Sequence, residues 1–262
     1  LIDGVNVSEK PISAKQIIGY LPESAPLYSD MTVSSFLAFT GEIRGKGSTE
    51  VNDAIETCFL EPVKNQSIDT LSKGYRHRTC LAQSILHDPE ILILDEPTDG
   101  LDPNQKQEVR NLIKRMGEDK AIIFSTHILE EVEAACTRAI IIDQGRVVAD
   151  GTPDELKSKS KSAGSIGVSI NGMAGSGISS EIKSLPDVSD VIELASSDSS
   201  FKGQIIPAKK NNSLSEGVFN MCKEKGLLLQ ELKVEEGRLD DVFRELTVAD
   251  TIIEEKPDSS QS

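Results

Sequence analysis

The sequence predicts an α/β domain followed by a smaller α+β domain. Strand-like and helix-like segments alternate up to about residue 157, which is typical of an α/β domain. A Ser/Lys-rich run at 158–165 interrupts them, and a second set of elements follows up to about residue 247. The chain has 262 residues, of which 37% are hydrophobic and 27% charged, so most of it should fold.

Apolar runs and helix-ending residues mark the elements of the first domain. A short strand is expected at 17–21, and helices at 33–43, at 49–60, after Ser72 and up to Val132. The runs ILILD (91–95), AIIFST (121–126) and AIIID (139–143) are continuous and apolar, as in buried strands. Pro103 at a first helical turn and Gly117 just past a helix end bracket a further helix.

The second domain is expected to follow the order β-α-β-β-α-β, which is ferredoxin-like. Its strands are predicted near 166–170, 188–194, 201–207 and 227–234, with helices ending before Pro186 and Gly226. A short helix, LDDVFRELT, closes the folded part, and the acidic, Ser-rich end is expected to be disordered. The predicted divisions are therefore 1–157, a linker at 158–165, an accessory domain at 166–247 and a tail at 248–262.

Composition limits the classes of partner. The chain carries 43 Asp and Glu against 28 Lys and Arg, a net charge of −15, and it has no Trp. Phosphate contacts need basic residues and single-strand binding needs aromatic platforms, so we expect no nucleic acid partner. No stretch reaches the roughly 20 apolar residues of a membrane span. The four cysteines form no CxxC pair, which favours buried free thiols over disulfides or a metal site.

The strongest chemical signal is ILILDEP. A buried strand delivers Asp95 and Glu96 at its carboxyl end, where open α/β sheets bind ligands. Adjacent acids repel each other unless a cation or a substrate uses them. In P-loop NTPases the Asp of this strand holds Mg²⁺, and a Glu directly after it can deprotonate an attacking water. The alternative is an ordinary strand end with surface acids.

Three neighbouring segments point to a phosphate site. In LSKGYRHR (71–78), Ser72 stands where a helix N-cap would be and Gly74 allows close backbone approach, so this helix start could bind an anion. His127 ends the segment IIFSTH, where it could donate to a γ-phosphate. The loop DGLDP (99–103) precedes a helix. Each segment also has a purely structural interpretation: a Ser cap, a structural His and a generic turn.

Together, in order and spacing, these segments resemble the ATP-binding cassette (ABC) family. LSKGY resembles the signature loop, ILILDE the Walker B strand, Gly100 to Asp102 the D-loop, and His127 the switch histidine. The resemblance covers about residues 1–157 and implies a P-loop NTPase-like ATPase core with a helical subdomain. IGYLPESAPLYSDMTV (18–33) and LDDVFRELT look most like bacterial exporter ATPases, especially the gliding-motility branch.

The resemblance implies ATP and Mg²⁺ as cofactors and an ATPase that powers transport. Asp95 and Glu23 would hold the metal, and Glu96 and His127 would be catalytic. A transmembrane permease subunit would be touched through the loop around Glu23. The protein would then lie peripherally at the cytoplasmic face of the inner membrane.

The resemblance also implies a second ATPase subunit, in a homo- or heterodimer arranged head to tail. Ser72 and Gly74 of one subunit would close over the γ-phosphate held by the other. Asp102 would communicate across this dimer.

Two departures from the family pattern stand out. Glu23 occupies a position where most of the family has Gln, although Glu also occurs in the branch that this chain resembles. No G-x-x-x-x-G-K-[ST] occurs in the 262 residues. The resemblance places that P-loop before Leu1, so we expect an N-terminally truncated sequence that is inactive alone.

Two alternatives remain. A non-catalytic regulatory ABC subunit would donate its signature motif to the ATP site of a partner. A soluble DNA-repair ATPase of the same superfamily would need long coiled coils or a basic surface, and neither feature is evident in the sequence.

Overall fold

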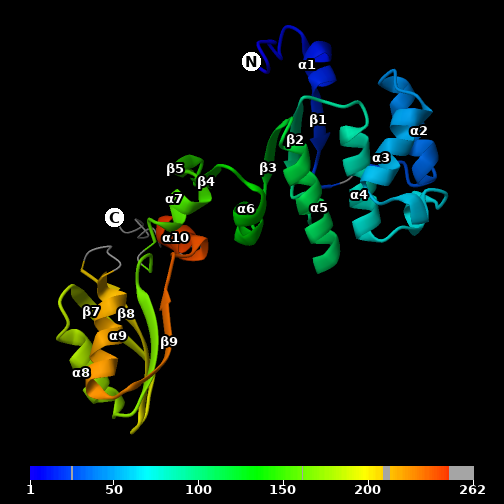
Figure 1. The fold of residues 1–262 in the computed structure, drawn as a ribbon. Coiled ribbons are helices and arrows are strands. Elements are labelled where there is room, and N and C mark those ends of the chain that lie inside the picture. The colour runs from blue at the N-terminus through cyan, green and yellow to red at the C-terminus, as the bar shows by residue number, and fades with distance from the viewer. Residues whose placement is uncertain (25, 161, 209–212, 248–262) are drawn as a thin grey trace, which may run out of the picture. The chain divides into compact units, whose positions relative to one another are not determined.

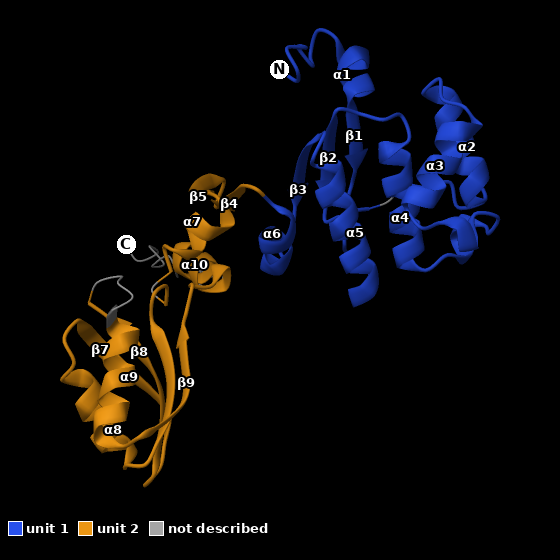
Figure 2. Cartoon of the chain, in the orientation of Figure 1, with its two compact units in different colours: residues 1–136 blue, residues 137–262 orange. Residues whose placement is uncertain are grey.

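The computed structural model describes residues 1–24, 26–160, 162–208 and 213–247, and it divides into two compact units, 1–136 and 137–262 (Figure 2). The tail predicted at 248–262 lies outside the described residues. Within the described part, every helix is too short or too polar to span a membrane.

Unit 1 is built on a parallel three-stranded sheet in the order β1-β2-β3. Figure 1 shows α2, α3 and α4 grouped to one side of this sheet. Two short 3₁₀ turns, Glu61–Val63 and Ile68–Thr70, precede α4. The elements are α1 (Pro11–Ile17), β1 (Ile18–Leu21), α2 (Val33–Ile43), α3 (Ser48–Thr57), α4 (Lys73–Ile85), β2 (Ile91–Asp95), α5 (Pro103–Met116), β3 (Ala121–Ser125) and α6 (Leu129–Ala135).

The two faces of this sheet differ in burial. Leu21, Leu92 and Leu94 are fully buried in a core shared with α2 to α5. The next row across the strands, Tyr20, Ile93 and Ile123 in register, faces the other way, and Tyr20 and Ile123 are 56% and 66% exposed. The expectation of a buried AIIFST strand is therefore wrong for the part of unit 1 that the structure describes, because no described segment of that unit covers this face.

A second apolar run also proves more exposed than predicted. AIIID forms β4 (Ala139–Asp143), which pairs only with β5 (Arg146–Gly151) in an antiparallel hairpin. Ile140 and Ile142 are exposed, because a two-stranded sheet leaves most of its surface uncovered. The short helix α7 (Pro153–Lys157) then contacts α10 (Leu239–Leu246). These elements belong to unit 2. The first compact unit therefore ends at residue 136, whereas the predicted first domain ends at residue 157.

The rest of unit 2 is an antiparallel sheet in the order β7-β8-β6-β9, with α8 and α9 on one face (Figure 1). Ile166, Val168 and Ile170 alternate along β6 and point into the core beneath the helices, as their period of two dictates. This is a ferredoxin-like arrangement. The elements are β6 (Ile166–Asn171), α8 (Gly175–Lys183), β7 (Val188–Ser196), β8 (Ser200–Pro207), α9 (Ser213–Lys225) and β9 (Leu228–Val234).

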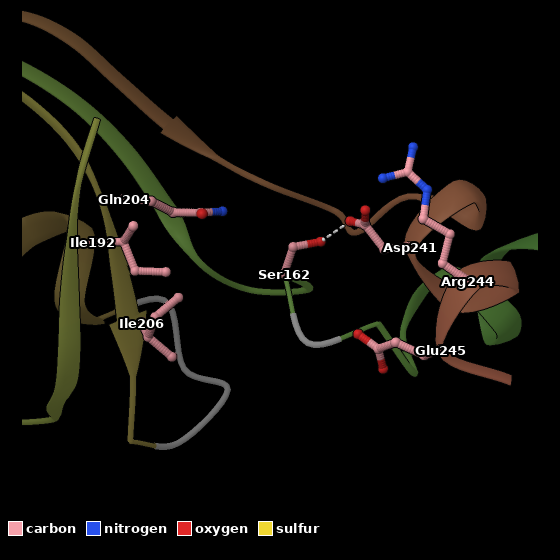
Figure 3. Close-up of a pocket in the computed structure, with 7 residues that line it drawn as sticks. All are labelled: Ser162, Ile192, Gln204, Ile206, Asp241, Arg244 and Glu245. Atoms are coloured by element: carbon pink, nitrogen blue, oxygen red, sulfur yellow. Dashed lines mark hydrogen bonds between the residues drawn. The ribbon is translucent and has the colours of Figure 1, made fainter. Parts of the chain in front are cut away.

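The segment predicted as a linker is partly buried. Ser160 and Ser165 are at most 2% exposed, and the Gly164 N–H donates to the carbonyl oxygen of Glu235 at 2.7 Å. Ser162 Oγ donates to Asp241 Oδ2 at 2.7 Å, beside an open hollow of about 320 Å³ (Figure 3). The hollow is lined by Ser162, Ile192, Gln204, Ile206, Asp241, Arg244 and Glu245.

Candidate functional site

The candidate site lies where β2 and β3 end side by side. Asp95, the last residue of β2, is in register with Ser125, the last residue of β3. Ser125 Oγ donates to Asp95 Oδ1 and accepts from the Glu96 N–H at 3.2 Å. The hydroxyl of Ser125 therefore fixes both the first acid and the backbone of the second.

Glu96 is held in an uncommon backbone conformation with φ at +47°. A non-glycine residue in this left-handed region is strained and persists only where surrounding contacts fix it. Two such contacts come from His127, whose backbone N–H and ring Nδ1–H both donate to Glu96 Oε1, at 3.1 and 2.8 Å. The strain is therefore localised at the residue that carries the second acid.

The electrostatics of this pair are asymmetric. The Glu96 side chain is 18% exposed, whereas that of His127 is 75% exposed. The hydrogen bond from the ring to the carboxylate, and the charge of that carboxylate, raise the pKa of His127. Glu96 Oε2 is buried and has no hydrogen-bond partner among the described residues. One oxygen of this acid is thus anchored by His127, and the other is a buried acceptor without a hydrogen-bond partner among the described residues.

The acids also suit a magnesium ion in part. Ser125 engages one oxygen of Asp95 and leaves the other for a cation, and hard carboxylate oxygens are the ligands that Mg²⁺ prefers. Glu23 follows β1, the strand next to β2, but it is exposed and forms no ion pair with a described residue. Among the described residues, no three His, Cys, Asp or Glu side chains gather closely enough to hold a metal.

The signature-like segment forms the start of α4. Ser72 is exposed and caps the helix, with its Oγ accepting from the Tyr75 N–H at 3.3 Å. Gly74 is buried, and a Cβ there would lie 2.9 Å from Gln105 Oε1. Lys73 Nζ donates to Asp99 Oδ2 at 2.6 Å. The absence of a side chain at Gly74 lets α4 pack closely against α5 and the loop that follows β2.

Asp102 stabilises the start of a helix. It is the N-cap of α5, and its Oδ1 accepts from the Gln105 N–H at 2.9 Å. Of the predicted site residues, Asp95 and Glu96 are joined through Ser125, and His127 bonds directly to Glu96. Ser72, Gly74, Asp102 and Glu23 lie outside this hydrogen-bonded group.

Sequence reasoning overlooked three polar residues around the site. Ser125 organises both acids, and Thr98 and Glu131 form a buried hydrogen bond beside them. The hydroxyl-rich ending of AIIFST was a usable signal for Ser125. Glu131 lies between Glu130 and Glu133, a pattern typical of a solvated helix face, so the sequence carries no signal for its burial.

Comparisons with known proteins show which proteins this chain resembles. The family model described as "ABC transporter" matches residues 1–99. The chain is 31% identical to the linearmycin resistance ATP-binding protein LnrL of Bacillus subtilis, over 72% of this chain and 62% of LnrL. It is 34% identical to the ABC transporter ATP-binding protein NatA of the same organism, over 62% of this chain and 68% of NatA.

A solved structure described as an ATP-binding subunit of an ABC transporter superposes with a TM-score of 0.55 at 26% identity. The match covers 60% of this chain and 68% of that one, and it confirms the predicted fold class. The chain spans between half and two thirds of the length of the first two curated relatives that it matches.

Proposed function

Because this chain belongs to the family of ABC transporter ATP-binding proteins, we propose that it is part of the ATPase subunit of an exporter. The observation that carries the proposal is the Glu96 carboxylate, anchored by His127 through one oxygen and unpaired at the other. This arrangement suits a general base for hydrolysis of the γ-phosphate. The name of one relative, a resistance protein, supports an exporter, and the motifs at 18–33 and 239–247 support the gliding-motility branch.

In this mechanism Glu96 Oε2 accepts the proton of the attacking water, which requires the atoms that bury this oxygen to move aside when ATP and water bind. Oε1 stays hydrogen-bonded to His127, so the acid does not have to reorient as the reaction begins. The exposed imidazole, with Nδ1–H committed to Glu96, presents Nε2 to the transferred phosphate. Positioning and stabilisation of charge supply most of the rate enhancement in phosphoryl transfer.

Asp95 would hold Mg²⁺ through its free oxygen, with Glu23 as a further ligand or as a ligand to a metal-bound water. When bound, the ion neutralises charge on the phosphate oxygens. It would also offset the repulsion between Asp95 and Glu96. Glu23 is exposed, so its participation requires the loop after β1 to turn toward Asp95.

We propose that the phosphate cradle comes from residues outside the 262 printed here, which contain no G-x-x-x-x-G-K-[ST]. The uncovered row of Tyr20, Ile93 and Ile123 supports this, because parallel sheets are normally covered on both faces. The outer edge of β3 pairs with no described strand and could accept one more. On this proposal the printed chain alone binds ATP weakly and does not hydrolyse it.

Two partners complete the proposal. Ser72 and Gly74 would close over the ATP held by a second ATPase subunit, and the exposed cap at Ser72 is accessible for that contact. Asp102, exposed at the start of α5, would communicate across the dimer. A transmembrane permease would dock near Glu23, which would place the protein at the cytoplasmic face of the membrane.

The test compares Glu96→Gln with Glu90→Gln in a form of the protein that includes a P-loop. Glu90 is an exposed acid just before the other end of the same strand, β2, and serves as the matched control. Loss of the general base should lower kcat about 100- to 10,000-fold while ATP binding persists. Glu90→Gln should keep wild-type turnover.

Unchanged hydrolysis in Glu96→Gln would refute the assignment of the base. If the wild-type protein never hydrolyses ATP but stimulates hydrolysis by a partner, and Ser72→Ala abolishes the stimulation, the regulatory alternative replaces the proposal.

A further inference from the structure

A buried carboxylate beside the site has no role in the proposed chemistry. Glu131 lies in the first turn of α6 and is only 1% exposed. Acids are rarely buried this deeply unless their oxygens are satisfied, because removing a carboxylate from water is costly. The position near a helix N-terminus is favourable for a negative charge, but it does not explain the burial.

Both oxygens of Glu131 are engaged, by hydroxyl groups from two different loops. Thr98, 1% exposed, donates its Oγ1 proton to Glu131 Oε1. Thr126 Oγ1 donates to Glu131 Oε2 at 2.9 Å. Thr98 belongs to the loop after β2, and Thr126 to the loop after β3. A single carboxylate therefore bridges the two loops.

Each threonine is fixed to a residue of the candidate site. On the β2 side, the Asp99 N–H donates to the Glu96 carbonyl oxygen at 3.0 Å, so Thr98 lies inside a closed turn that begins at Glu96. On the β3 side, Thr126 directly precedes His127, and its Oγ1 accepts from the Ile128 N–H at 3.1 Å. Holding the two threonines together therefore holds the turn that carries the acid against the turn that carries the histidine.

We propose that Glu131 is a positioning residue for ATP hydrolysis, whose buried carboxylate sets the turn of Glu96 against the turn of His127. The part that concerns hydrolysis rests on the proposed function, while the bridge between the loops does not. Glu131 acts through hydrogen-bond geometry, so its charge is dispensable if both threonines stay bridged.

Three substitutions separate geometry from charge. Glu131→Ala removes both acceptors and breaks the bridge. Glu131→Gln keeps one carbonyl oxygen for Thr98, and its amide can donate to the oxygen of Thr126, so the bridge survives without the charge. Glu130→Ala is the matched control, since Glu130 is the adjacent acid on the same helix and is exposed.

The first measurement is amide hydrogen exchange on the printed chain, which needs no ATP. We expect Glu131→Ala to lose protection in residues 96–101 and 126–128, while Glu131→Gln and Glu130→Ala exchange like the wild type. Thr98→Val, a milder change, should lose protection in the same two segments. Wild-type protection of both segments in Glu131→Ala would overturn the inference, whatever the protein does with ATP.

The second measurement is ATPase kinetics in a form that includes a P-loop. Loosened positioning should lower kcat about 10- to 100-fold in Glu131→Ala and leave the KM for ATP near its wild-type value. Glu131→Gln should restore turnover. Equal losses in Glu131→Ala and Glu131→Gln would show that the charge matters and would overturn the geometric role. If the exchange results are as expected but the wild-type protein does not hydrolyse ATP, the proposed function is contradicted and the bridge between the loops is still supported.

Discussion

The close approach of β1 to α4 makes Gly19 a sensitive point of unit 1. A Cβ at this position would overlap the backbone carbonyl oxygen of Ser84 in α4 and would lie 2.6 Å from Leu92 Cδ2 and 2.9 Å from Pro89 Cγ. Ordinary contacts begin near 3.4 Å, so the strand and the helix would have to separate by about 1 Å. The main obstacle is backbone, which cannot rotate away as a side chain can.

We therefore expect Gly19→Ala to lower the free energy of unfolding of unit 1 by about 3 kcal/mol, the upper end of typical overpacking costs. For a unit of 136 residues this corresponds to a fall in Tm of roughly 10 °C. Differential scanning calorimetry and urea unfolding measure the two quantities. Gly117→Ala is the control in the same unit, because its Cβ would make only ordinary contacts at 3.4 Å and beyond.

A loss below about 1 kcal/mol in Gly19→Ala would refute the reasoning, since it falls under the range for an overpacked core. It would mean that α4 can move away from β1 at little cost. The packing that joins the strand leading to Glu23 with the helix that starts after Ser72 would then be loose.

Three further outcomes can be checked on the same chain. Burial lowers the pKa of His77 below its usual 6.5, so the unfolded chain binds the proton first and stability should fall below about pH 6.5, by up to 1.4 kcal/mol per pH unit. Urea unfolding at about pH 5 and pH 7 should show that the free energy of unfolding changes less with pH in His77→Gln than in the wild type. Burial raises the pKa of Cys58 and Cys80 to about 12 and that of the less buried Cys136 to about 11, so maleimide should label Cys136 before those two, as read by mass spectrometry. Ser72→Ala should cost about 1 kcal/mol through the lost helix cap, measured by thermal unfolding.

The sequence predicts elements well where local chemistry and tertiary packing agree. The helix bracketed by Pro103 and Gly117 begins and ends where these residues indicate, because proline fits a first turn and glycine ends the helix. The strand ILILD also forms as expected. Burial was less predictable, since Ile123 and Ile140 depend on what covers them, and a run of apolar residues carries no information about that.

The candidate site was predictable only in part. Asp95 ends one apolar strand and His127 follows shortly after the other, and parallel strands bring such ends together. The bridge through Glu131 was not predictable, because it depends on a contact between Thr98 and Glu131, which are 33 residues apart along the chain. The helix α1 (Pro11–Ile17) was also missed, since it is short and buries only Ala14.

His127 bonds Glu96 through its main chain as well as through its ring, so orienting the carboxylate and contacting the phosphate need not both fall to the imidazole. The main-chain amide of His127 grips the same carboxylate oxygen as its ring does. The amide therefore holds the carboxylate independently of the ring, whose Nε2 is left to contact an incoming anion. A substitution that deletes only the imidazole would remove the group that contacts the anion. It would leave the main-chain hydrogen bond that orients the Glu96 carboxylate.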